Sequence, residues 1–159
     1  MKLLCAILTN QIQRRLEERK FLAPEQAGFR SREECMSHAL TLIEVAQRRS
    51  ISDQQPIYVC FIDFQKVFDT APHEALFLKM ERAGVSGKCL AFFRALYVDS
   101  WMHMRLGDGS RIPSIRICHG LRQSDPASPL LFNIFINDLL NNCRQYGLEV
   151  SWIDCGDAR

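Results

Sequence analysis

A chain of 159 residues is long enough for one compact domain or for part of a larger one. Its 47% hydrophobic and 24% charged residues exclude wholesale disorder, and a net charge of +2 excludes a protein-wide basic field. The positive charge is concentrated in residues 1–50, where nine Lys and Arg residues face six acids. This excess is a weak indication of a phosphate-facing surface in that third of the chain.

The seven cysteines are widely spaced and form no C-x-x-C pair. This pattern predicts reduced thiols in an intracellular protein, in the nucleus or the cytoplasm, and neither a disulfide framework nor a zinc site. The apolar start, Met1–Leu8, is interrupted at Thr9, and no run approaches the length of a membrane span. We therefore expect no signal peptide and no membrane partner.

Two amphipathic helices are expected in the first third of the chain. In residues 2–20 and 32–49 the apolar side chains recur at helical spacing, and Ser31 with Glu34 forms a capping box before the second helix. The apolar positions of the two helices are Leu4, Ile7, Leu8, Ile12 and Leu16, and Met36, Leu40, Ile43 and Ala46.

A buried strand is predicted over Ile57–Phe64, because an apolar, β-favouring run ends there at the carboxylate of Asp63. A strand end of this kind can hold a divalent cation next to a phosphate. An ordinary turn, or an ion pair between Asp63 and Lys66, is the alternative. For Phe68, five residues further on, the alternative to a functional role is core packing.

The rest of the chain predicts helices over residues 74–82, 87–97 and 129–146, with Gly147 ending the last one. Residues 101–106 and 112–118 alternate as two strands, and 107–110 form the turn between them. The predicted fold class is α/β (α+β), with helices packed on a small antiparallel sheet.

Two loop segments carry polar groups suited to phosphate. Gly120, Arg122 and Gln123 precede the helix that begins at Ser128-Pro129, and a helix amino terminus beside these groups can hold phosphate and base edges. An ordinary loop and helix cap explains them equally well. In Gln26–Arg30, the glycine permits a bend, Phe29 is expected in the core, and Arg30 can face a phosphate.

Taken together, three segments of this chain resemble the reverse transcriptases of non-LTR (LINE-like) retrotransposons. Gln26–Arg30 is similar to the family's Q-x-G-F-R segment, Phe61–Asp69 to its motif A, and Gly120–Phe132 to its motif B, continued by Asn133–Leu140. The resemblance implies part of the fingers and most of the palm of a right-hand polymerase. It predicts a partial reverse transcriptase domain over residues 1–148 and an irregular tail over 149–159.

The resemblance also implies roles for single residues in RNA-directed DNA polymerisation. Asp63 would be the catalytic, metal-binding carboxylate, with the backbone at Ile62 and Phe64 as further metal contacts, and Phe68 would be the steric gate against ribonucleotides. Template or nucleotide contacts would come from Gly120, Arg122, Gln123 and Arg30. The implied cofactor is Mg²⁺, and the implied partners are an RNA template, a DNA primer and deoxynucleoside triphosphates.

Three departures from the family pattern bear on activity. Val67 replaces the usual alanine of motif A, and Ser124 replaces the second glycine of motif B, where a Cβ would interfere if positive φ is required. The chain contains no Asp-Asp pair, the mark of motif C, and Asp154 and Asp157 do not replace it. Because one carboxylate cannot hold two divalent ions, we expect this chain to be inactive, or nearly so, on its own.

Two alternatives remain open. The first alternative is a non-catalytic RNA- or DNA-binding remnant that uses its basic amino-terminal third and the Gln123 loop. The second alternative is a functionless pseudogene product that exposes apolar surface. No pattern in the sequence predicts the oligomeric state.

Overall fold

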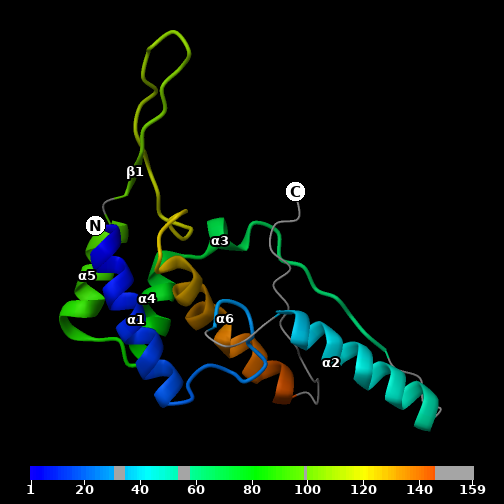
Figure 1. The fold of residues 1–159 in the computed structure, drawn as a ribbon. Coiled ribbons are helices and arrows are strands. Elements are labelled where there is room, and N and C mark those ends of the chain that lie inside the picture. Colours follow the sequence, from blue (N-terminus) through cyan, green and yellow to red (C-terminus); the bar gives the residue numbers. More distant parts are fainter. Residues whose placement is uncertain (31–34, 54–57, 99, 146–159) are drawn as a thin grey trace. The chain divides into compact units, whose positions relative to one another are not determined.

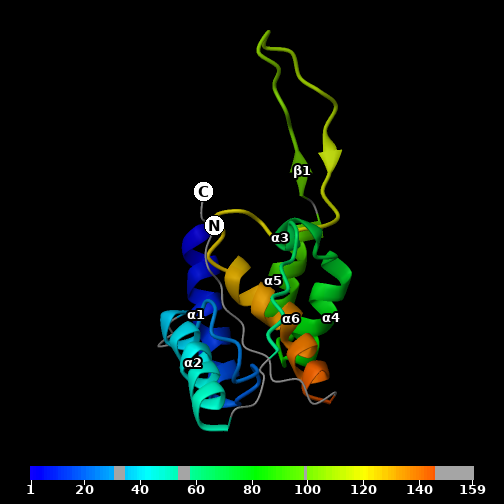
Figure 2. The same ribbon diagram turned by 90° about the vertical axis from the view of Figure 1, so that its right-hand side faces the viewer.

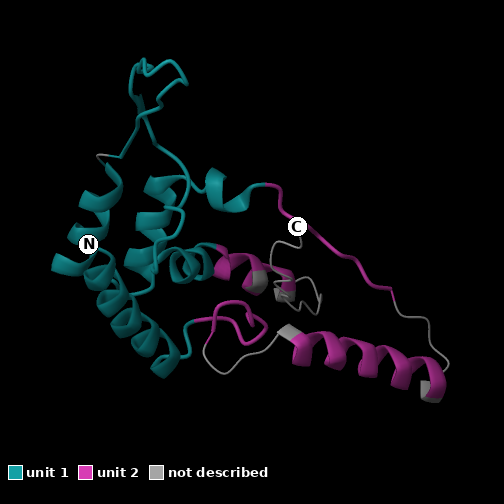
Figure 3. Cartoon of the chain, turned by 45° about the horizontal axis from the view of Figure 1, so that its top comes forward, with its two compact units in different colours: residues 1–21, 66–135 teal, residues 22–65, 136–159 magenta. Residues whose placement is uncertain are grey.

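The computed structural model describes residues 1–30, 35–53, 58–98 and 100–145 (Figure 1). The chain divides into two compact units, one made of residues 1–21 and 66–135 and the other of residues 22–65 and 136–159 (Figure 3). The capping pair Ser31 and Glu34, the helix stop at Gly147 and the tail 149–159 lie outside the described residues.

Unit 1 is a group of helices from which a β-hairpin extends (Figure 2). Its helices are α1 (Lys2–Glu18), α3 (Val67–Thr70), α4 (His73–Arg82), α5 (Gly87–Val98) and the first part of α6 (Ser128–Gln145). The predicted helices 2–20, 74–82, 87–97 and 129–146 are thus confirmed within one or two residues over their described parts. Helix α3 was not predicted.

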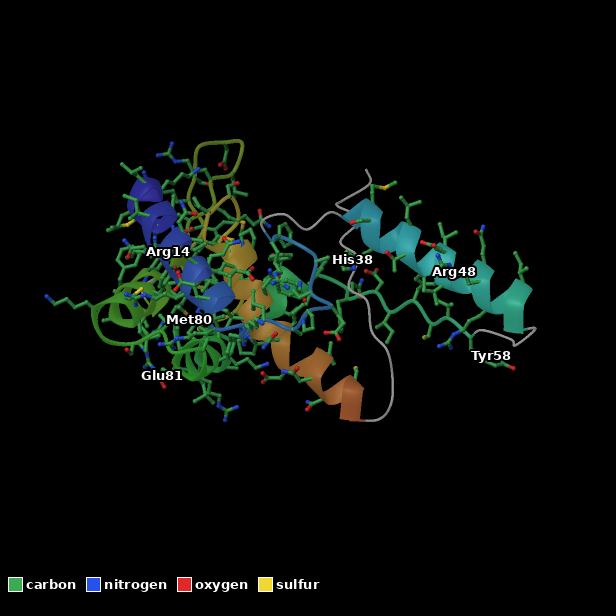
Figure 4. All side chains as sticks on the ribbon, turned by 60° about the horizontal axis from the view of Figure 1, so that its bottom comes forward. Arg14, His38, Arg48, Tyr58, Met80 and Glu81 are labelled. Carbon is green, nitrogen blue, oxygen red and sulfur yellow. The ribbon has the colours of Figure 1, made fainter. Side chains whose placement is uncertain are left out.

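The core of unit 1 is built from large apolar side chains on these helices. Phe77 and Met80 of α4, Phe93 and Tyr97 of α5 and Phe132 of α6 are 0–1% exposed (Figure 4 labels Met80). Lys79 of α4 reinforces the contact with α6, since its Nζ donates to the Phe135 carbonyl and lies 4.6 Å from the centroid of that ring. Burial of these large apolar side chains stabilises the unit.

The buried face of α1 differs from the predicted one. Cys5, Thr9, Ile12 and Leu16 are buried, whereas Leu4 and Ile7 are each 46% exposed. Thr9 can be buried because its hydroxyl donates to the Cys5 carbonyl at 2.7 Å, which satisfies the polar group within the helix. The predicted face was wrong by a fraction of a turn. The prediction used apolar residues alone, whereas a threonine whose hydroxyl is hydrogen-bonded within the helix can also be buried.

The predicted hairpin is confirmed, with shorter strands than expected. Strands β1 (Trp101–Met102) and β2 (Ile115–Arg116) pair antiparallel, and a further bridge joins Arg105 to Arg111. The turn lies at 107–110, where Gly109 has φ +84° and its N–H donates to the Leu106 carbonyl. The structure is therefore helix-rich with a small antiparallel sheet, as the fold class predicted.

Unit 2 contains α2 (Cys35–Arg48), the π-helical turn η1 (Arg49–Asp53) and the second part of α6. The side chain of Asn137 in α6 accepts a hydrogen bond from the backbone N–H of Ala23 at 2.8 Å, which ties the loop after α1 to this helix. Among the residues that the structure describes, no helix is both long and apolar enough to cross a membrane.

The predicted strand Ile57–Phe64 is wrong over its described part, residues 58–64. These residues have no regular secondary structure, and Tyr58, Phe61 and Ile62 are 91%, 82% and 74% exposed (Figure 4 labels Tyr58). A strand forms only where another backbone satisfies its N–H and C=O groups. None of residues 58–64 belongs to a strand of the described part of the chain, so their β-favouring side chains are not sufficient.

Candidate functional site

Two of the segments that suggested a function meet within unit 1. Residues 68–71, the end of the motif A-like segment and the two residues after it, lie along the start of the motif B-like segment at Gly120–Leu121. The Gly120 N–H donates to the Ala71 carbonyl at 2.8 Å, and the Leu121 N–H donates to the Phe68 carbonyl at 2.7 Å. An antiparallel bridge between Pro72 and His119 extends the contact. Backbone hydrogen bonds therefore join segments that lie about fifty residues apart in sequence.

Gly120 is required by this contact. Its φ is +87°, a conformation that costs little only for glycine. A Cβ at this position would lie 2.8 Å from the carbonyl oxygen of Asp69 and 3.1 Å from its Cα. The backbones approach so closely that no side chain fits between them.

His73 of α4 and Tyr97 of α5 support the same contact. The ring Nε2 of His73 lies 2.8 Å from the Gly120 carbonyl, and because a carbonyl only accepts, Nε2 carries the proton and donates. The His73 ring meets the Tyr97 ring edge-on at 4.9 Å, and both side chains are buried. His73 is thus a buried structural residue that holds the Gly120 carbonyl in place.

Phe68 is held by α6. Its ring lies 4.5 Å from that of Phe132, centroid to centroid, with the planes tilted by 30°. Phe132 is 1% exposed whereas Phe68 is partly exposed. The Phe68 ring is therefore fixed from within the core and still presents part of its surface to solvent.

Arg122 is exposed, and its guanidinium is bound to the end of α5. Its Nη1 donates to the Leu96 carbonyl at 3.2 Å and to the Ser100 hydroxyl at 3.4 Å, while its backbone N–H donates to the Tyr97 hydroxyl at 3.4 Å. Burial raises the pKa of Tyr97 above its usual value. The phenol therefore stays protonated to a higher pH than an exposed tyrosine would.

The loop from Gln123 to Ser128 turns tightly before α6. Ser124 has φ +60°, so the position where the family pattern has glycine does adopt the conformation that favours glycine. Asp125 accepts from the Ala127 N–H at 2.9 Å, and the Ser128 hydroxyl donates back to the Arg122 carbonyl at 2.5 Å. Asp125, not Ser128, provides the side-chain acceptor at the start of the helix. The Gln123 side chain is exposed on this loop.

The metal-binding candidates belong to unit 2. Asp63 and Ile62 are exposed, and Phe64 is 38% exposed. Among the described residues, no group of three or more His, Cys, Asp or Glu side chains could hold a metal ion. Mg²⁺ is often bound through one or two carboxylates together with substrate phosphates, so Asp63 fits as one hard oxygen ligand of an Mg²⁺ site and not as a complete site.

Arg30 is also in unit 2. Its Nη1 donates to the backbone carbonyls of Ala23 at 3.2 Å and Gln26 at 3.1 Å, so the guanidinium holds its own loop in shape. Phe29 has φ +57° and is 46% exposed, which corrects the expectation that it lies in the core. A phosphate contact by Arg30 stays a prediction.

Several residues that position the site were not predicted from the sequence. Tyr97 lies outside the motif-like segments, and its contact with Arg122 depends on the packing of α5. Asp69 and Asp125 lie inside those segments, but no role was predicted for either, although Asp69 closely approaches Gly120 and Asp125 accepts from the Ala127 N–H. The one available signal was Ser124, whose replacement of a family glycine pointed to a position of positive φ.

Comparisons with known proteins give one family and several relatives. The family described as reverse transcriptase (RNA-dependent DNA polymerase) matches residues 1–153. The chain is 31% identical over 136 residues to the retrovirus-related Pol polyprotein from type-1 retrotransposable element R2 of Popillia japonica. It is 26% identical over 117 residues to the corresponding polyprotein from type-2 element R2DM of Drosophila melanogaster.

These matches cover 84% and 74% of this chain but only 19% and 11% of the two relatives. The chain thus spans about a fifth or less of the length of these curated proteins. The resemblance to retrotransposon reverse transcriptases is confirmed.

Proposed function

Because this chain belongs to the reverse transcriptase (RNA-dependent DNA polymerase) family, we propose that it provides part of a site for RNA-directed DNA synthesis. The observation that carries the proposal is the backbone contact between Phe68–Ala71 and Gly120–Leu121, which joins the two motif-like segments. Polymerisation needs a nucleotide, a template base and a metal-binding carboxylate in fixed relative positions. The backbone hydrogen bonds of this contact, and the close approach that requires glycine at position 120, provide that rigidity for Phe68 and Gln123.

In this proposal Asp63 supplies one oxygen ligand to Mg²⁺, with the backbone carbonyls at Ile62 and Phe64 beside it. The ion, when bound, neutralises the charge of the triphosphate. Gln123 and Arg122 contact the template or the incoming base pair from the exposed loop, and Arg30 contacts nucleic-acid backbone or nucleotide. The partners are an RNA template, a DNA primer and deoxynucleoside triphosphates.

Phe68 acts as the gate against ribonucleotides. Its ring is braced by Phe132 and partly exposed, so it can exclude a 2′-hydroxyl without moving aside. Phe68→Ala in an active polymerase should raise the ratio of ribonucleotide to deoxyribonucleotide incorporation. An unchanged ratio would show that the ring serves core packing alone.

We further propose that these 159 residues do not polymerise DNA by themselves. The sequence has no Asp-Asp pair, and a single carboxylate at Asp63 cannot hold two Mg²⁺ ions beside a triphosphate. Purified chain should give no primer extension above background with Mg²⁺ and an RNA template. Extension above background would refute this part of the proposal.

The function is tested in a chimera in which this chain replaces the 136 matched residues of the Popillia japonica polyprotein. The chimera should extend a primer on an RNA template, and Asp63→Asn should abolish extension. Glu74→Gln, which neutralises an exposed carboxylate of α4, is the matched control and should leave extension unchanged. Equal activity of the Asp63 and Glu74 variants would refute the metal-binding role.

A non-catalytic nucleic-acid-binding remnant is the second candidate, favoured by the exposed Arg122 and Gln123 on a fixed loop. Salt-dependent RNA binding by a chain whose chimera fails to extend a primer would support it. No RNA binding at low salt together with an inactive chimera would point to a functionless product.

We also propose one domain over residues 1–148, which limited proteolysis would test by release of the tail 149–159 alone.

A further inference from the structure

The β-hairpin after α5 has two chemically different faces. Trp101 pairs with Arg116 and Met102 with Ile115, and the next pair in this register is His103 with Ser114, whose Oγ lies 2.7 Å from the ring Nδ1. Closer to the turn the pairing shifts by one residue, to Arg105 with Arg111, which leaves Pro113 as a bulge. Directly paired residues share a face of a ribbon. One face therefore carries Trp101, His103, Arg105, Arg111, Ser114 and Arg116.

The opposite face carries Met102, Met104, Leu106, Ile112 and Ile115. The cationic face has three arginines, and the one acid in residues 100–118, Asp108, sits at the turn. The Asp108 carboxylate is engaged there, because the backbone N–H and the hydroxyl of Ser110 both donate to it, at 2.8 and 2.6 Å. These bonds lower the pKa of Asp108, so it remains ionised and bound to the turn. The acid does not neutralise the arginines along the strands.

Arg105 and Arg111 stand directly opposite each other. The flanking hydrogen bonds, from the Leu106 N–H to the Ser110 carbonyl and from the Ile112 N–H to the Met104 carbonyl, make them a non-hydrogen-bonded pair. In such a pair the Cα atoms are only about 4.5 Å apart, and like charges so placed destabilise a hairpin. Phosphates bound to the two guanidiniums would offset this repulsion and gain charge-assisted hydrogen bonds.

Trp101 extends the same face with an aromatic surface, since its side chain is 47% exposed. The hairpin projects from the helices of unit 1, so a long ligand can lie along it (Figure 2). Phosphates spaced along a strand, with bases that stack on an indole, match arginines spaced along a ribbon beside an aromatic ring. We propose that this face binds a single strand of nucleic acid, with phosphates on Arg105 and Arg111 and a base against Trp101. The proposal rests on the proposed function only for the identity of that strand as RNA.

The test measures binding of a labelled single-stranded RNA oligonucleotide to the full 159-residue chain by fluorescence anisotropy at several salt concentrations. If Arg105 and Arg111 each neutralise one phosphate, R105Q/R111Q should reduce the slope of log affinity against log salt by about 1.4. The wild-type chain would then lose about sevenfold more affinity than the variant between about 50 and 200 mM salt. The matched control, R82Q/K88Q, removes two exposed charges from α4 and α5 and should keep the wild-type slope.

Trp101→Ala should weaken binding by about fivefold or more without changing the salt slope, and Trp101→Phe should retain most of the affinity. Equal slopes for R105Q/R111Q and the wild type would overturn the proposal. An equal loss of slope in R82Q/K88Q would also overturn it, because the effect would then be one of net charge. Circular dichroism confirms that each variant is folded.

The two proposals fail separately. If the chimera extends primers and depends on Asp63 while hairpin variants bind RNA normally, the hairpin proposal is wrong and the polymerase function stands. If binding depends on Arg105 and Arg111 while the chimera is inactive, the hairpin proposal stands alone. Preference for a DNA oligonucleotide of the same sequence would place a DNA strand on the hairpin and overturn its assignment to RNA.

Discussion

Replacing Gly120 with alanine should destabilise unit 1 more than the same change at Gly84, Gly87, Gly107 or Gly109, where no backbone atom lies within 4 Å of the new methyl group. The new methyl group would lie 2.8 Å from the Asp69 carbonyl oxygen, against backbone that cannot rotate away as a side chain could. The φ of +87° adds about 1–2 kcal/mol of backbone strain for alanine. Separation of the two segments would also weaken three hydrogen bonds, at about 0.5–1.5 kcal/mol each.

These contributions reduce the free energy of unfolding by about 3–6 kcal/mol, a large share of the stability of a small domain. Gly87→Ala is the matched control, since Gly87 has φ +59° and a Cβ there would meet nothing within 4 Å. Its cost should be the strain alone, about 1–2 kcal/mol. Urea unfolding followed by circular dichroism measures both. Equal midpoints for the two variants would refute the close-approach argument.

Three further outcomes are expected. Burial raises the pKa of Tyr97, so above about pH 10 the folded state keeps the phenol protonated while the unfolded chain ionises it. The free energy of unfolding should therefore fall as the pH rises above about 10, and it should fall less steeply in Tyr97→Phe. Thermal unfolding at pH 9–11 would measure this difference. A double-mutant cycle of Phe68→Ala and Phe132→Ala should give a coupling energy of about 0.5–1.5 kcal/mol in urea unfolding, and a value near zero would contradict the ring contact. In maleimide labelling read by mass spectrometry, exposed Cys60 should react well before Cys5. Cys5 is buried, and its thiol pKa is raised by burial and by the Asp125 carboxylate. Equal rates would contradict this difference in burial.

Elements whose pattern is local were predicted well from the sequence. The helical spacing in residues 74–82 and 87–97 and the turn at 107–110 depend on neighbours within a few residues, and α4, α5 and the hairpin follow them closely. The buried face of α1 was predicted less well, because the hydrogen bond that makes Thr9 an interior residue is not visible in an apolar pattern.

Features that depend on distant partners were not predictable in the same way. Residues 58–64 have the composition of a strand but adopt no regular secondary structure, because a strand also needs a partner backbone that composition does not indicate. The approach of Gly120 to Asp69 joins residues far apart in sequence, and no spacing rule indicates it. The resemblance to a family did indicate positive φ at position 124, because a glycine pattern records backbone geometry that one sequence does not.

The discontinuous make-up of the two units has a consequence for synthesis on the ribosome. Helix α1 belongs with residues 66–135, so forty-four intervening residues, 22–65, must be translated before the first of its partners exists. At about 5–20 residues per second, Ile12 and Leu16 remain uncovered for roughly 2–9 s, and for longer until α6 emerges. The nascent chain therefore presents the apolar face of an amphipathic helix during that interval, a surface of the kind that chaperones bind.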